Sequence, residues 1–588
     1  MGRTPLFRTV RRLLRRAHAA NVLGLSPQED TAARPPGPSR RDVLLGSLLV
    51  PLAAACGDNL KPEDETDEQA PGIAIVGGGI AGLTAAHFLR LGHVRAEVYE
   101  ASMRIGGRMW TDRESLAASA QLVELGGELI DTDHIVIQTL MASHGLALDD
   151  LPAATAGLEQ DLFVMAIGGG PNPNHMPVNP QQIVSQFTPV AAKMAAAVMM
   201  TEGTDPASEM LFERIDNMSI PEWLQDPTIG AGLAPDALIR RILEVAYLEE
   251  FGLEVSEQSA WNLITLIDFE TVDPFRVFGD SDERYHTHEG NDALPAKMSA
   301  RLGDRIHLDH ALTRVVKGAE TYSLTFSTSG GEHVVEAAHV IFALPFTKLR
   351  EVELAEAGLS PEKLTIIEEL GYGTNAKLML QFRSRPWETG PRASNGSVIT
   401  DVGDSPADGS ALGSGLQTTW ATSRGQDGPE GILTNFVGGR RGIAIGEGTP
   451  ESQAQQVLPW IEEVFPGTQA QYIPNSAIRM HWPTYPWMKG SYASYKKGQW
   501  AFFGKEGARE DNAHFCGEHC SEDYQGYMEG AAETGAMVAA EVLDDLEVSY
   551  PPSLASLVDM LTAERPRGSY HAGFGQRMKL SQIRRRAR

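Results

Sequence analysis

The sequence predicts an α/β protein that combines a parallel sheet with a second, mixed α+β domain. The parallel sheet follows from a short apolar run, three consecutive glycines and a helical stretch within residues 73–91. Helical periodicity over residues 134–287 and strand patterns over residues 288–350 indicate the rest of the architecture. A chain of 588 residues with 42% hydrophobic content can bury more than one core, so more than one domain is expected.

The glycine-rich segment is typical of a turn that binds a dinucleotide. Ile73–Val76 predicts a buried parallel strand, and Leu83–Leu91 predicts the helix that follows it. Gly77 permits the tight turn, Gly79 lets the backbone approach a pyrophosphate, and Gly82 lets the helix pack closely on the strand. The phosphates would then lie at the N-terminus of the helix.

An acidic residue follows the glycine turn at the expected distance. Glu100 ends the second predicted strand, Ala96–Tyr99, about 20 residues after the turn, where a carboxylate binds ribose hydroxyls. A carboxylate at this position argues against a 2′-phosphate. A glycine pair that includes Gly107 comes next, flanked by Arg104 and Arg108, and we expect this loop to cover and neutralise the pyrophosphate.

Further motifs extend this pattern along most of the chain. They are Leu125–Gly127, Gly373–Lys377, Gly490–Tyr492, Cys516–Glu518 and Gly526–Gly530. Together with Glu100–Arg108, their order and spacing over residues 72–543 resemble the flavin-containing amine oxidases. That family includes the monoamine, polyamine and L-amino acid oxidases. The resemblance implies a discontinuous, Rossmann-like FAD-binding domain and a mixed α+β substrate-binding domain.

The domain boundaries combine this resemblance with the local patterns. Residues 72–133, 288–350 and 481–548 are assigned to the FAD-binding domain, because the last strand and helix return the chain to the flavin. Residues 134–287 and 351–480 are assigned to the substrate-binding domain, the first segment mainly helical and the second rich in strands. Residues 549–588 are expected to form a C-terminal extension.

The resemblance also implies how the cofactor is held. It places Leu312 near the adenine, Glu518 on the ribityl arm, and Gly127 and the backbone N–H of Met528 against the flavin. Some monoamine oxidases attach FAD through a cysteine at the position of Ser491 in this chain. The sequence therefore predicts FAD that is bound non-covalently, and it predicts no metal site.

The implied reaction is hydride removal from a carbon that bears an unprotonated amine. Water hydrolyses the resulting imine, and O2 reoxidises the flavin with release of H2O2; the cofactor carries the redox step. Tyr492 and Tyr527 match the two aromatic residues that form a cage before the flavin, and Lys377 matches the lysine that holds a water at flavin N5. Trp482 is expected to line the same pocket.

The substrate is less well defined by the sequence. L-amino acid oxidases commonly carry an arginine soon after the Leu-Gly motif, whereas this chain offers Glu128 and Asp131. An acid at Glu128 would repel a substrate carboxylate, which favours monoamines or polyamines, although Glu128 could equally be a structural hydrogen-bond partner. An L-amino acid oxidase, a flavin desaturase of an apolar substrate and a noncatalytic FAD-binding envelope protein remain open as alternatives.

The formal charge of −27 argues against nucleic acid as a partner and favours attraction of cationic small molecules, although solubility alone explains it equally well. The oligomeric state is left open, with a homodimer as one option. Three cysteines are too few for a disulfide framework, and Cys516 and Cys520 are expected to be buried free thiols.

The first 56 residues resemble an export signal. Arg40 and Arg41 precede an apolar stretch of about 14 residues, too short to span a bilayer, and this pattern matches a bacterial twin-arginine signal. Cys56 closes a segment that resembles a lipoprotein cleavage site, although a leucine lies one position further upstream than usual. Residues 57–71 would form an acidic linker. The expected location is therefore periplasmic, either free or membrane-tethered through Cys56.

Overall fold

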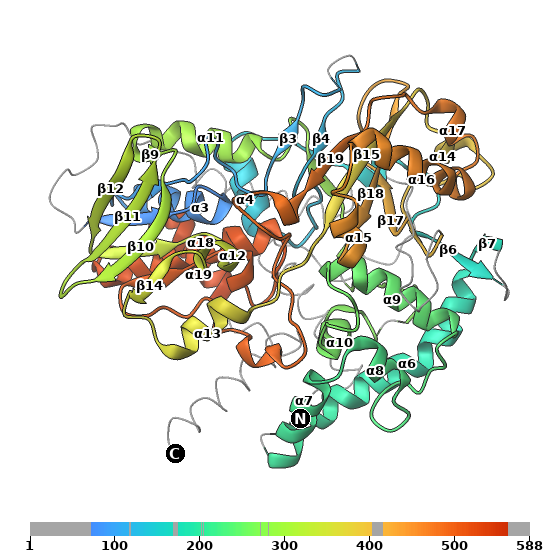
Figure 1. Ribbon diagram of the computed structural model, residues 1–588, viewed down its shortest axis with the longest axis horizontal. Helices are drawn as coiled ribbons and strands as arrows, with labels where there is room; N and C mark the ends of the chain where they lie inside the picture. Colours follow the sequence, from blue (N-terminus) through green and yellow to red (C-terminus); the bar gives the residue numbers. More distant parts are fainter. Residues whose placement is uncertain are drawn as a thin grey trace, which may run out of the picture.

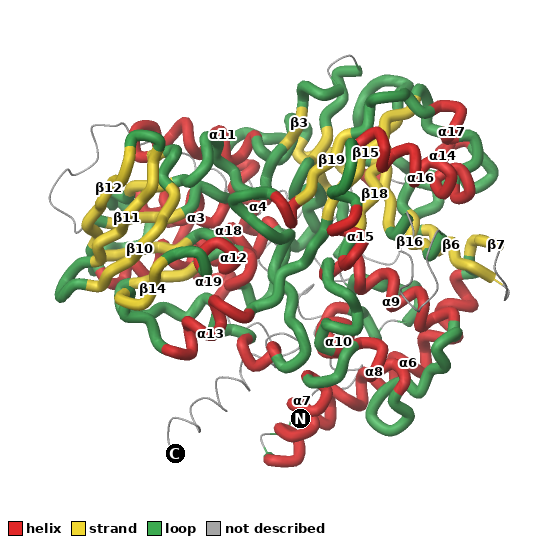
Figure 2. The backbone as a smooth tube through the Cα atoms, viewed as in Figure 1, coloured by secondary structure: helices red, strands yellow, loops and turns green. Residues whose placement is uncertain are grey.

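The computed structural model describes residues 72–562, apart from 117–118, 168–173, 202, 204, 271, 280 and 403–415. The leader at 1–56, the linker at 57–71 and the end of the chain at 563–588 lie outside the described residues, so the predictions made for them remain predictions. Figure 1 shows two halves: the first, on the left, contains the glycine turn, and the second, on the right, has a sheet above a helical lobe. Figure 2 shows the same division in strands and helices.

A five-stranded parallel sheet forms the centre of the first half. Its order is β20-β13-β1-β2-β9, and every neighbouring pair is parallel. The strands are β1 (Ile73–Val76), β2 (Glu97–Tyr99), β9 (Ile306–His307), β13 (His339–Phe342) and β20 (Ala513–Phe515). All four residues of β1 are buried, as expected for an apolar run covered on both faces. The predicted Rossmann-like α/β fold is confirmed, and its sheet is assembled from distant segments.

Two long helices pack against each other beside this sheet. They are α3 (Ile80–Leu91), which follows the glycine turn, and α18 (Met528–Asp545), near the end of the chain. A Cβ at Gly535 would lie 2.3 Å from the Ala81 carbonyl oxygen, so the close approach of the two helices requires glycine. The helices α4 (Ile135–Ser143), α11 (Ala293–Leu302) and α19 (Pro552–Thr562) surround the pair.

Helix α19 lies within the segment that the sequence predicts to be a C-terminal extension. Leu554 and Leu557 are fully buried in the hydrophobic cluster that also contains residues of α3 and α18. The start of that segment therefore belongs to the folded body. The sequence pattern did not reveal this, because a short amphipathic helix at a chain end also occurs in solvent-exposed extensions.

A four-stranded sheet covers the other side of the first half. Its order is β12-β11-β10-β14, with β10 (Ala311–Lys317), β11 (Tyr322–Thr328), β12 (Gly331–Ala337) and β14 (Glu353–Glu356). β14 pairs in parallel with β10, although it lies beyond the boundary predicted at residue 350. The helices α12 (Phe346–Leu349) and α13 (Pro361–Glu369) flank β14 in the chain.

A seven-stranded sheet organises the second half. Its order is β19-β15-β18-β17-β16-β6-β7, and β15 (Ala376–Phe382) is buried along its whole length. The other strands are β6 (Leu162–Ile167), β7 (Asn174–Pro177), β16 (Val398–Thr400), β17 (Thr418–Ala421), β18 (Gly431–Val437) and β19 (Ile478–His481). Accompanying helices are α14 (Pro386–Thr389), α15 (Gly439–Ala444), α16 (Pro450–Val464) and α17 (Thr468–Gln471).

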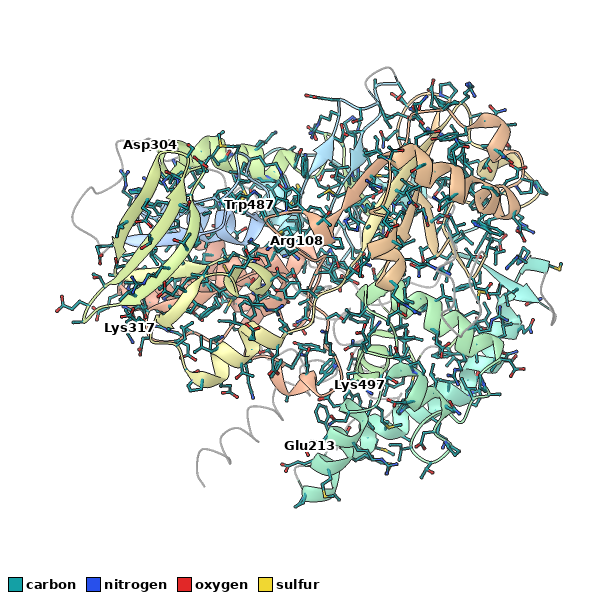
Figure 3. All side chains as sticks on the ribbon, viewed as in Figure 1. Arg108, Glu213, Asp304, Lys317, Trp487 and Lys497 are labelled. Atoms are coloured by element: carbon teal, nitrogen blue, oxygen red, sulfur yellow. The ribbon has the colours of Figure 1, made fainter. Side chains whose placement is uncertain are left out.

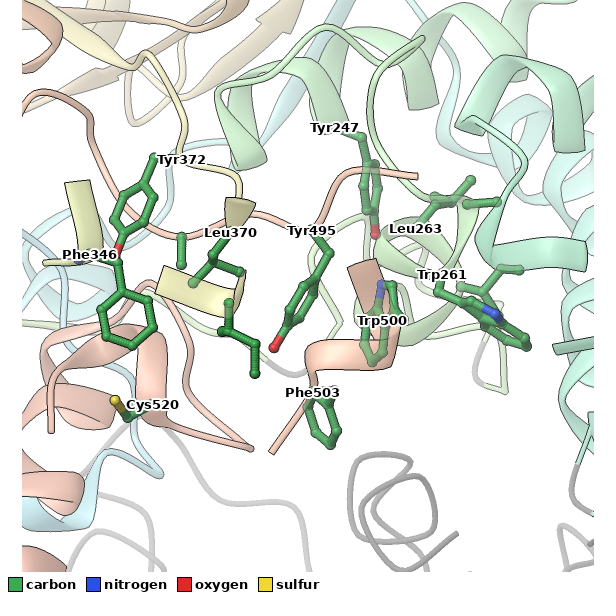
Figure 4. Packing of buried hydrophobic residues seen from close by; sticks show 14 of the residues in the cluster. Tyr247, Trp261, Leu263, Phe346, Leu370, Tyr372, Tyr495, Trp500, Phe503 and Cys520 are labelled. Atoms are coloured by element: carbon green, nitrogen blue, oxygen red, sulfur yellow. The ribbon is translucent and has the colours of Figure 1, made fainter. Parts of the chain in front are cut away.

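The helical lobe lies below this sheet in Figure 1. It contains α6 (Pro180–Thr201), α7 (Pro206–Asp216), α8 (Ile220–Gln225), α9 (Leu238–Phe251) and α10 (Ala260–Leu266). Among the described residues, α6 alone is long and apolar enough to cross a membrane, but Phe187 and Met194 are buried in the protein core. Figure 4 shows how α9 and α10 are anchored: Tyr495, Trp500 and Phe503 gather beside Tyr247 and Trp261.

Smaller elements complete the description. Two short pairs of strands are β3 (Thr111–Asp112) with β4 (Val123–Glu124), and β5 (Leu148–Asp150) with β8 (Tyr285–Thr287); α5 spans Leu151–Ala154. Cys516 and Cys520 are both buried free thiols, as expected.

Candidate active site

A cavity of about 480 Å³ lies where the two halves meet. It is lined by residues from the glycine turn, from the seven-stranded sheet and from the start of α18. Figure 3 labels two lining residues, Arg108 and Trp487, near this junction. All the predicted site residues line the cavity except Gly82, namely Gly77, Gly79, Glu100, Arg104, Gly107, Arg108, Gly127, Glu128, Leu312, Lys377, Trp482, Tyr492, Glu518, Tyr527 and Met528.

The glycines of the first turn meet three different structural requirements. Gly77 has a φ of +115°, and a Cβ there would lie 2.5 Å from the Ala343 carbonyl oxygen. A Cβ at Gly82 would lie 2.1 Å from the Gly77 carbonyl oxygen, so this glycine serves helix packing and has no place in the cavity wall. A Cβ at Gly79 would meet no atom within 4 Å, which leaves open space above the turn.

The N-terminus of α3 opens into that space. Gly79 is its N-cap and supplies no side-chain cap, and Ile80 and Ala81 also line the cavity. The N–H groups of the first turn have no partner within the helix, and the helix dipole favours an anion there. This arrangement fits a pyrophosphate.

The second glycine loop lies directly against the first. The N–H of Gly106 donates to the Gly78 carbonyl at 2.8 Å, and a Cβ at Gly107 would lie 3.3 Å from the Gly79 Cα. The Arg104 guanidinium donates to the carbonyls of its own loop and lies 4.0 Å above the Trp110 ring. Its buried Nε has no hydrogen-bond partner among the described residues, so one donor remains for a bound group.

At the other end of the turn, Glu100 is held in place by two backbone groups. Its carboxylate accepts the N–H of Gly78 at 2.8 Å and the N–H of Ser102 at 2.9 Å. Each carboxylate oxygen can accept further bonds, which is compatible with ribose hydroxyls. Leu312, on β10, lines the same cavity.

Arg108 and Glu518 connect the second glycine loop to the end of the chain. The Arg108 Nη1 lies 2.7 Å from the Glu518 carboxylate and 2.7 Å from the Ser491 carbonyl oxygen. The other Glu518 oxygen accepts the N–H of Gly526 at 3.0 Å. The charge of Arg108 is therefore matched by Glu518, and neutralisation of a pyrophosphate by the two arginines remains a prediction.

Helix α18 presents a second uncapped N-terminus to the cavity. Its N-cap is Tyr527, which makes no side-chain cap bond, and its first residue is Met528. A Cβ at Gly127 would lie 2.8 Å from the Met528 side chain, so Gly127 provides the room that this helix start requires. Two helix N-termini from opposite ends of the chain thus face one cavity.

Lys377 and Glu128 form an ion pair in the wall of the cavity, and both are more than nine-tenths buried. The Lys377 Nζ donates to Glu128 at 2.7 Å, and also to the carbonyls of Gly126 at 2.8 Å and Glu124 at 3.0 Å. Burial favours the neutral acid, but the ammonium group of Lys377 outweighs burial and holds the pKa of Glu128 below its ordinary value.

The remaining contacts of Glu128 satisfy its carboxylate. Its second oxygen accepts the Trp420 indole N–H at 2.8 Å and the Thr422 hydroxyl at 3.0 Å. Because Lys377 neutralises it and three protein groups bind it, Glu128 is a structural partner, the alternative that the sequence left open. Its contacts do not support repulsion of a substrate carboxylate.

The two predicted cage tyrosines meet at one residue that the sequence did not reveal. The Tyr492 hydroxyl donates to the main-chain carbonyl of Glu250, and the Tyr527 hydroxyl donates to the Glu250 carboxylate at 3.3 Å. Glu250 lies near the end of α9 and lines the cavity. Burial, reinforced by Asp131 and opposed by the Tyr527 hydroxyl, raises the pKa of Glu250 to about 7. The signal available in the sequence was a pair of consecutive acids near the end of an apolar helix.

A second acid, Glu283, lines the same cavity. Its φ of +43° is unusual for a residue with a side chain, and its N–H donates to the Asp131 carboxylate at 2.7 Å. Burial raises the pKa of Glu283 to about 8, with Arg424 opposing and nearby acids reinforcing the shift.

Aromatic side chains complete the lining. Trp420 and Phe436 pack edge to face at 5.4 Å, and Trp482 packs against Tyr485 at 5.5 Å. A Cβ at Gly126 would lie 3.1 Å from the Trp482 ring, so Trp482 lies beside the loop that accepts the Lys377 bonds.

Comparison with known proteins identifies the family. Residues 80–543 match flavin-containing amine oxidoreductases. The chain belongs to this family. The prediction of an oxidoreductase of the amine oxidase family is therefore confirmed, and the family implies a flavin cofactor, for which the two uncapped helices and the open space above Gly79 provide a fitting site.

Several amine oxidoreductases resemble this chain over most of their length. The flavin-dependent L-tryptophan oxidase of Lentzea aerocolonigenes is 24% identical, over 80% of this chain and 98% of that protein. The pseudooxynicotine dehydrogenase of Pseudomonas sp is 22% identical, over 87% of this chain and 97% of that protein. These relatives differ in the substrate that each is named for.

Solved structures show the same fold. Putrescine oxidase bound to putrescine matches with a TM-score of 0.65 and 18% identity, covering 81% of this chain and 99% of that one. Cyclohexylamine oxidase from Brevibacterium oxydans IH-35A matches with a TM-score of 0.65 and 20% identity, covering 82% of this chain and 100% of that one.

Proposed function

We propose that this protein catalyses the FAD-dependent oxidative deamination of a primary or secondary amine, either a monoamine or a polyamine. Bound FAD would accept a hydride from the carbon next to nitrogen, and O2 would be the final acceptor, with H2O2 as a product. The observation that carries the proposal is the convergence of Tyr492, Tyr527 and Lys377 on the cavity that both uncapped helices face.

The charges around the cavity support an amine as substrate. The lining cations are engaged by protein oxygens: Arg108 by Glu518, Lys377 by Glu128, Lys348 by Glu351, and Arg104 by loop carbonyls. Glu250 and Glu283, in contrast, have no ion-pair partner among the described residues. The electron-rich faces of Tyr492 and Tyr527 add a further attraction for a cationic amine.

Lys377 is proposed to act on the O2 half of the reaction through a bound water. Its ammonium group already donates to three protein oxygens, so a water would share or replace one of these bonds. The Gly126 carbonyl is the candidate for replacement, because it belongs to the loop that lines the cavity.

Non-covalent attachment of FAD is supported by the position of Ser491. Its hydroxyl donates to the Asn375 side chain at 2.6 Å, and neither Cys516 nor Cys520 lines the cavity. Precipitation of the purified protein with acid should therefore release yellow FAD into the supernatant. Colour retained in the washed precipitate would contradict this part of the proposal.

The proposed function is tested by mixing the purified holoenzyme, without O2, with a panel of monoamines, diamines, polyamines and L-amino acids. We expect amines to bleach the flavin absorbance, and we expect one equivalent of H2O2 per turnover once O2 is admitted. Colourless protein that does not take up FAD, or a flavin that no amine reduces, would overturn the proposal.

L-amino acid oxidation is the second candidate. The Lys377–Glu128 ion pair removes the charge that would have repelled a substrate carboxylate, and an L-tryptophan oxidase is among the relatives. In the same panel, faster flavin reduction by an L-amino acid than by the amine of the same side chain would favour this candidate.

We also propose that the protein is exported by a bacterial twin-arginine route and resides in the periplasm, either free or tethered by a lipid on Cys56. The support is the sequence of residues 1–56, with Arg40, Arg41 and Cys56. Replacing both arginines by lysine should retain the precursor in the cytoplasm. C56S should release an otherwise membrane-bound protein, and unchanged fractionation would contradict the tether.

A further inference from the structure

The Glu250 carboxylate lines the cavity and has no cation as a partner among the described residues. Glu128 and Glu518 each face a cation, whereas the Glu250 carboxylate accepts one hydrogen bond among the described residues, from the Tyr527 hydroxyl at 3.3 Å. Its main-chain carbonyl accepts the second cage hydroxyl, from Tyr492. The carboxylate is therefore tied to the aromatic pair and still has lone pairs that face the cavity.

The groups that face Glu250 are neutral phenols or other acids. Tyr247 and Glu249 come from its own helix, Asp131 from the loop before α4, Glu283 from the segment before β8, and Tyr492 and Tyr527 from the segments that precede α18. No lysine or arginine in the described part of the chain forms an ion pair with it. A cation that enters the cavity would thus meet an unpaired carboxylate.

An aliphatic amine enters such a cavity as an ammonium ion, because its pKa is about 10. Hydride removal needs the neutral amine, since the lone pair of nitrogen supports the developing C=N bond. A nearby proton acceptor therefore helps whenever the pH is well below 10. The required acceptor must lie beside the aromatic pair and must be ionised at the working pH.

On the basis of the proposed function, we propose that Glu250 is a catalytic residue that accepts a proton from the substrate ammonium group. In this step one N–H bond of the ammonium breaks and one O–H bond forms on the Glu250 carboxylate. The two charges cancel, no electron is transferred, and the neutral amine remains between the tyrosines. Hydride removal then proceeds as in the proposed function.

The environment of Glu250 suits this step. Burial and the charge of Asp131 raise the pKa of Glu250 to about 7, and the Tyr527 hydroxyl limits the rise. A general base is most effective when its pKa lies near the pH at which it works. The unpaired carboxylate is therefore ionised at slightly alkaline pH and is still basic enough to take a proton.

The test compares flavin reduction by one amine, without O2, in the wild-type holoenzyme, E250Q and E283Q across pH 6–10. Glutamine keeps a carbonyl oxygen for Tyr527 and leaves the main-chain acceptor of Tyr492 intact, so E250Q removes the base while keeping both contacts. The E283Q variant removes the other unpaired acid of the same cavity.

We expect the second-order rate constant of the wild type to fall below about pH 7. In E250Q the rate constant should already begin to fall near the pKa of the amine itself. At pH 7 it should be roughly 100-fold below the wild-type value, and the difference should disappear toward pH 10. E283Q should keep the wild-type decrease of the rate constant below about pH 7. E250D should keep it too, because it retains a carboxylate. The infrared absorbance of protonated carboxyl groups that titrates near pH 7 should be smaller in E250Q than in the wild type by the contribution of one carboxyl group, because Glu506 still titrates there.

If the decrease of the rate constant below about pH 7 is unchanged in E250Q, or is lost in E283Q alone, the assignment of Glu250 is overturned. Flavin content and circular dichroism, measured for each variant, separate these results from a folding defect. If no amine reduces the flavin of the wild type, the proposed function fails and this inference fails with it. Normal reduction with an unchanged E250Q profile rejects the inference alone.

Discussion

The Lys377 ammonium group lies 2.7 Å from the Glu128 carboxylate, in a wall of the cavity where both side chains are more than nine-tenths buried. Removing one partner leaves a buried charge without its counter-ion, which costs about 3–5 kcal/mol. We therefore expect K377M and E128Q each to lower the unfolding midpoint in urea strongly. The double variant should recover much of the loss, and additive losses would contradict the coupling.

Variants of the same pair distinguish a structural role of Lys377 from a role in the O2 reaction. We expect K377M to slow the rate at which the reduced holoenzyme consumes O2 by tenfold or more, because it removes the cation that would hold the water. E128Q is the matched control, since it keeps the lysine and its two carbonyl contacts. Equal O2 rates in K377M and the wild type would remove Lys377 from this role.

Gly79 and Gly82 should respond differently to a single added methyl group. Gly79 has an extended backbone that alanine accepts, and its Cβ would point into open space, so G79A should fold normally and hold at least tenfold less flavin. G82A places a Cβ 2.1 Å from the Gly77 carbonyl oxygen, so it should lower the melting temperature. The ratio of flavin to protein absorbance and a thermal scan distinguish them; normal flavin content in G79A would argue against a pyrophosphate at this turn.

Tyr527 offers a test of the aromatic wall. Y527F removes one hydroxyl and its bond to Glu250 at 3.3 Å, which corresponds to about 1 kcal/mol and less than a tenfold loss in kcat/KM. Y527A removes the ring as well, so its loss should exceed that of Y527F by at least another factor of ten. Similar values for the two variants would mean that the ring takes no part in binding the amine.

Buried acids with raised pKa values should make stability depend on pH. Glu506 accepts the Tyr495 hydroxyl at 2.6 Å, and burial raises its pKa to about 7. Between the unfolded value of about 4.3 and the folded value, the native state binds more protons than the unfolded state, so the free energy of unfolding falls as pH rises. The fall from Glu506 alone amounts to about 4 kcal/mol at most.

E506Q removes this contribution and keeps an oxygen for Tyr495. Urea unfolding of the wild type and E506Q at pH 5 and pH 8 should therefore show a smaller decrease in the variant. A decrease of the same size in both proteins would show that Glu506 is ionised in the folded state throughout this range.

Local patterns predicted much of the fold. β1 has the predicted bounds, because an uninterrupted apolar run that ends at glycine has few alternatives. α3 begins at Ile80 and not at Leu83, since Ile80, Ala81 and Gly82 already form its first turn. The pairing of β14 with β10 depends on a contact between distant segments, and no local pattern encodes such a contact.

The site divides in the same way. The glycine turns, Glu100 and the tyrosines belong to contiguous motifs, so the sequence could locate them. The role of Glu128 required knowledge that β15 brings Lys377 beside it, and the role of Glu250 required knowledge that α9 reaches the cavity. The sequence also suggested that Arg104 and Arg108 share a pyrophosphate, and this remains a prediction: Glu518 pairs with Arg108, while the Arg104 Nε has no partner among the described residues.

The contact of α3 with α18 has a consequence for biosynthesis. The first glycine turn and α3 leave the ribosome early, but α18, which carries Gly535 and packs on α3, emerges only when nearly the whole polypeptide has been made. A nascent chain has only half of the chamber in which the flavin is expected. Capture of the nucleotide must therefore await completion of translation, and chains that end prematurely before residue 528 should accumulate without colour.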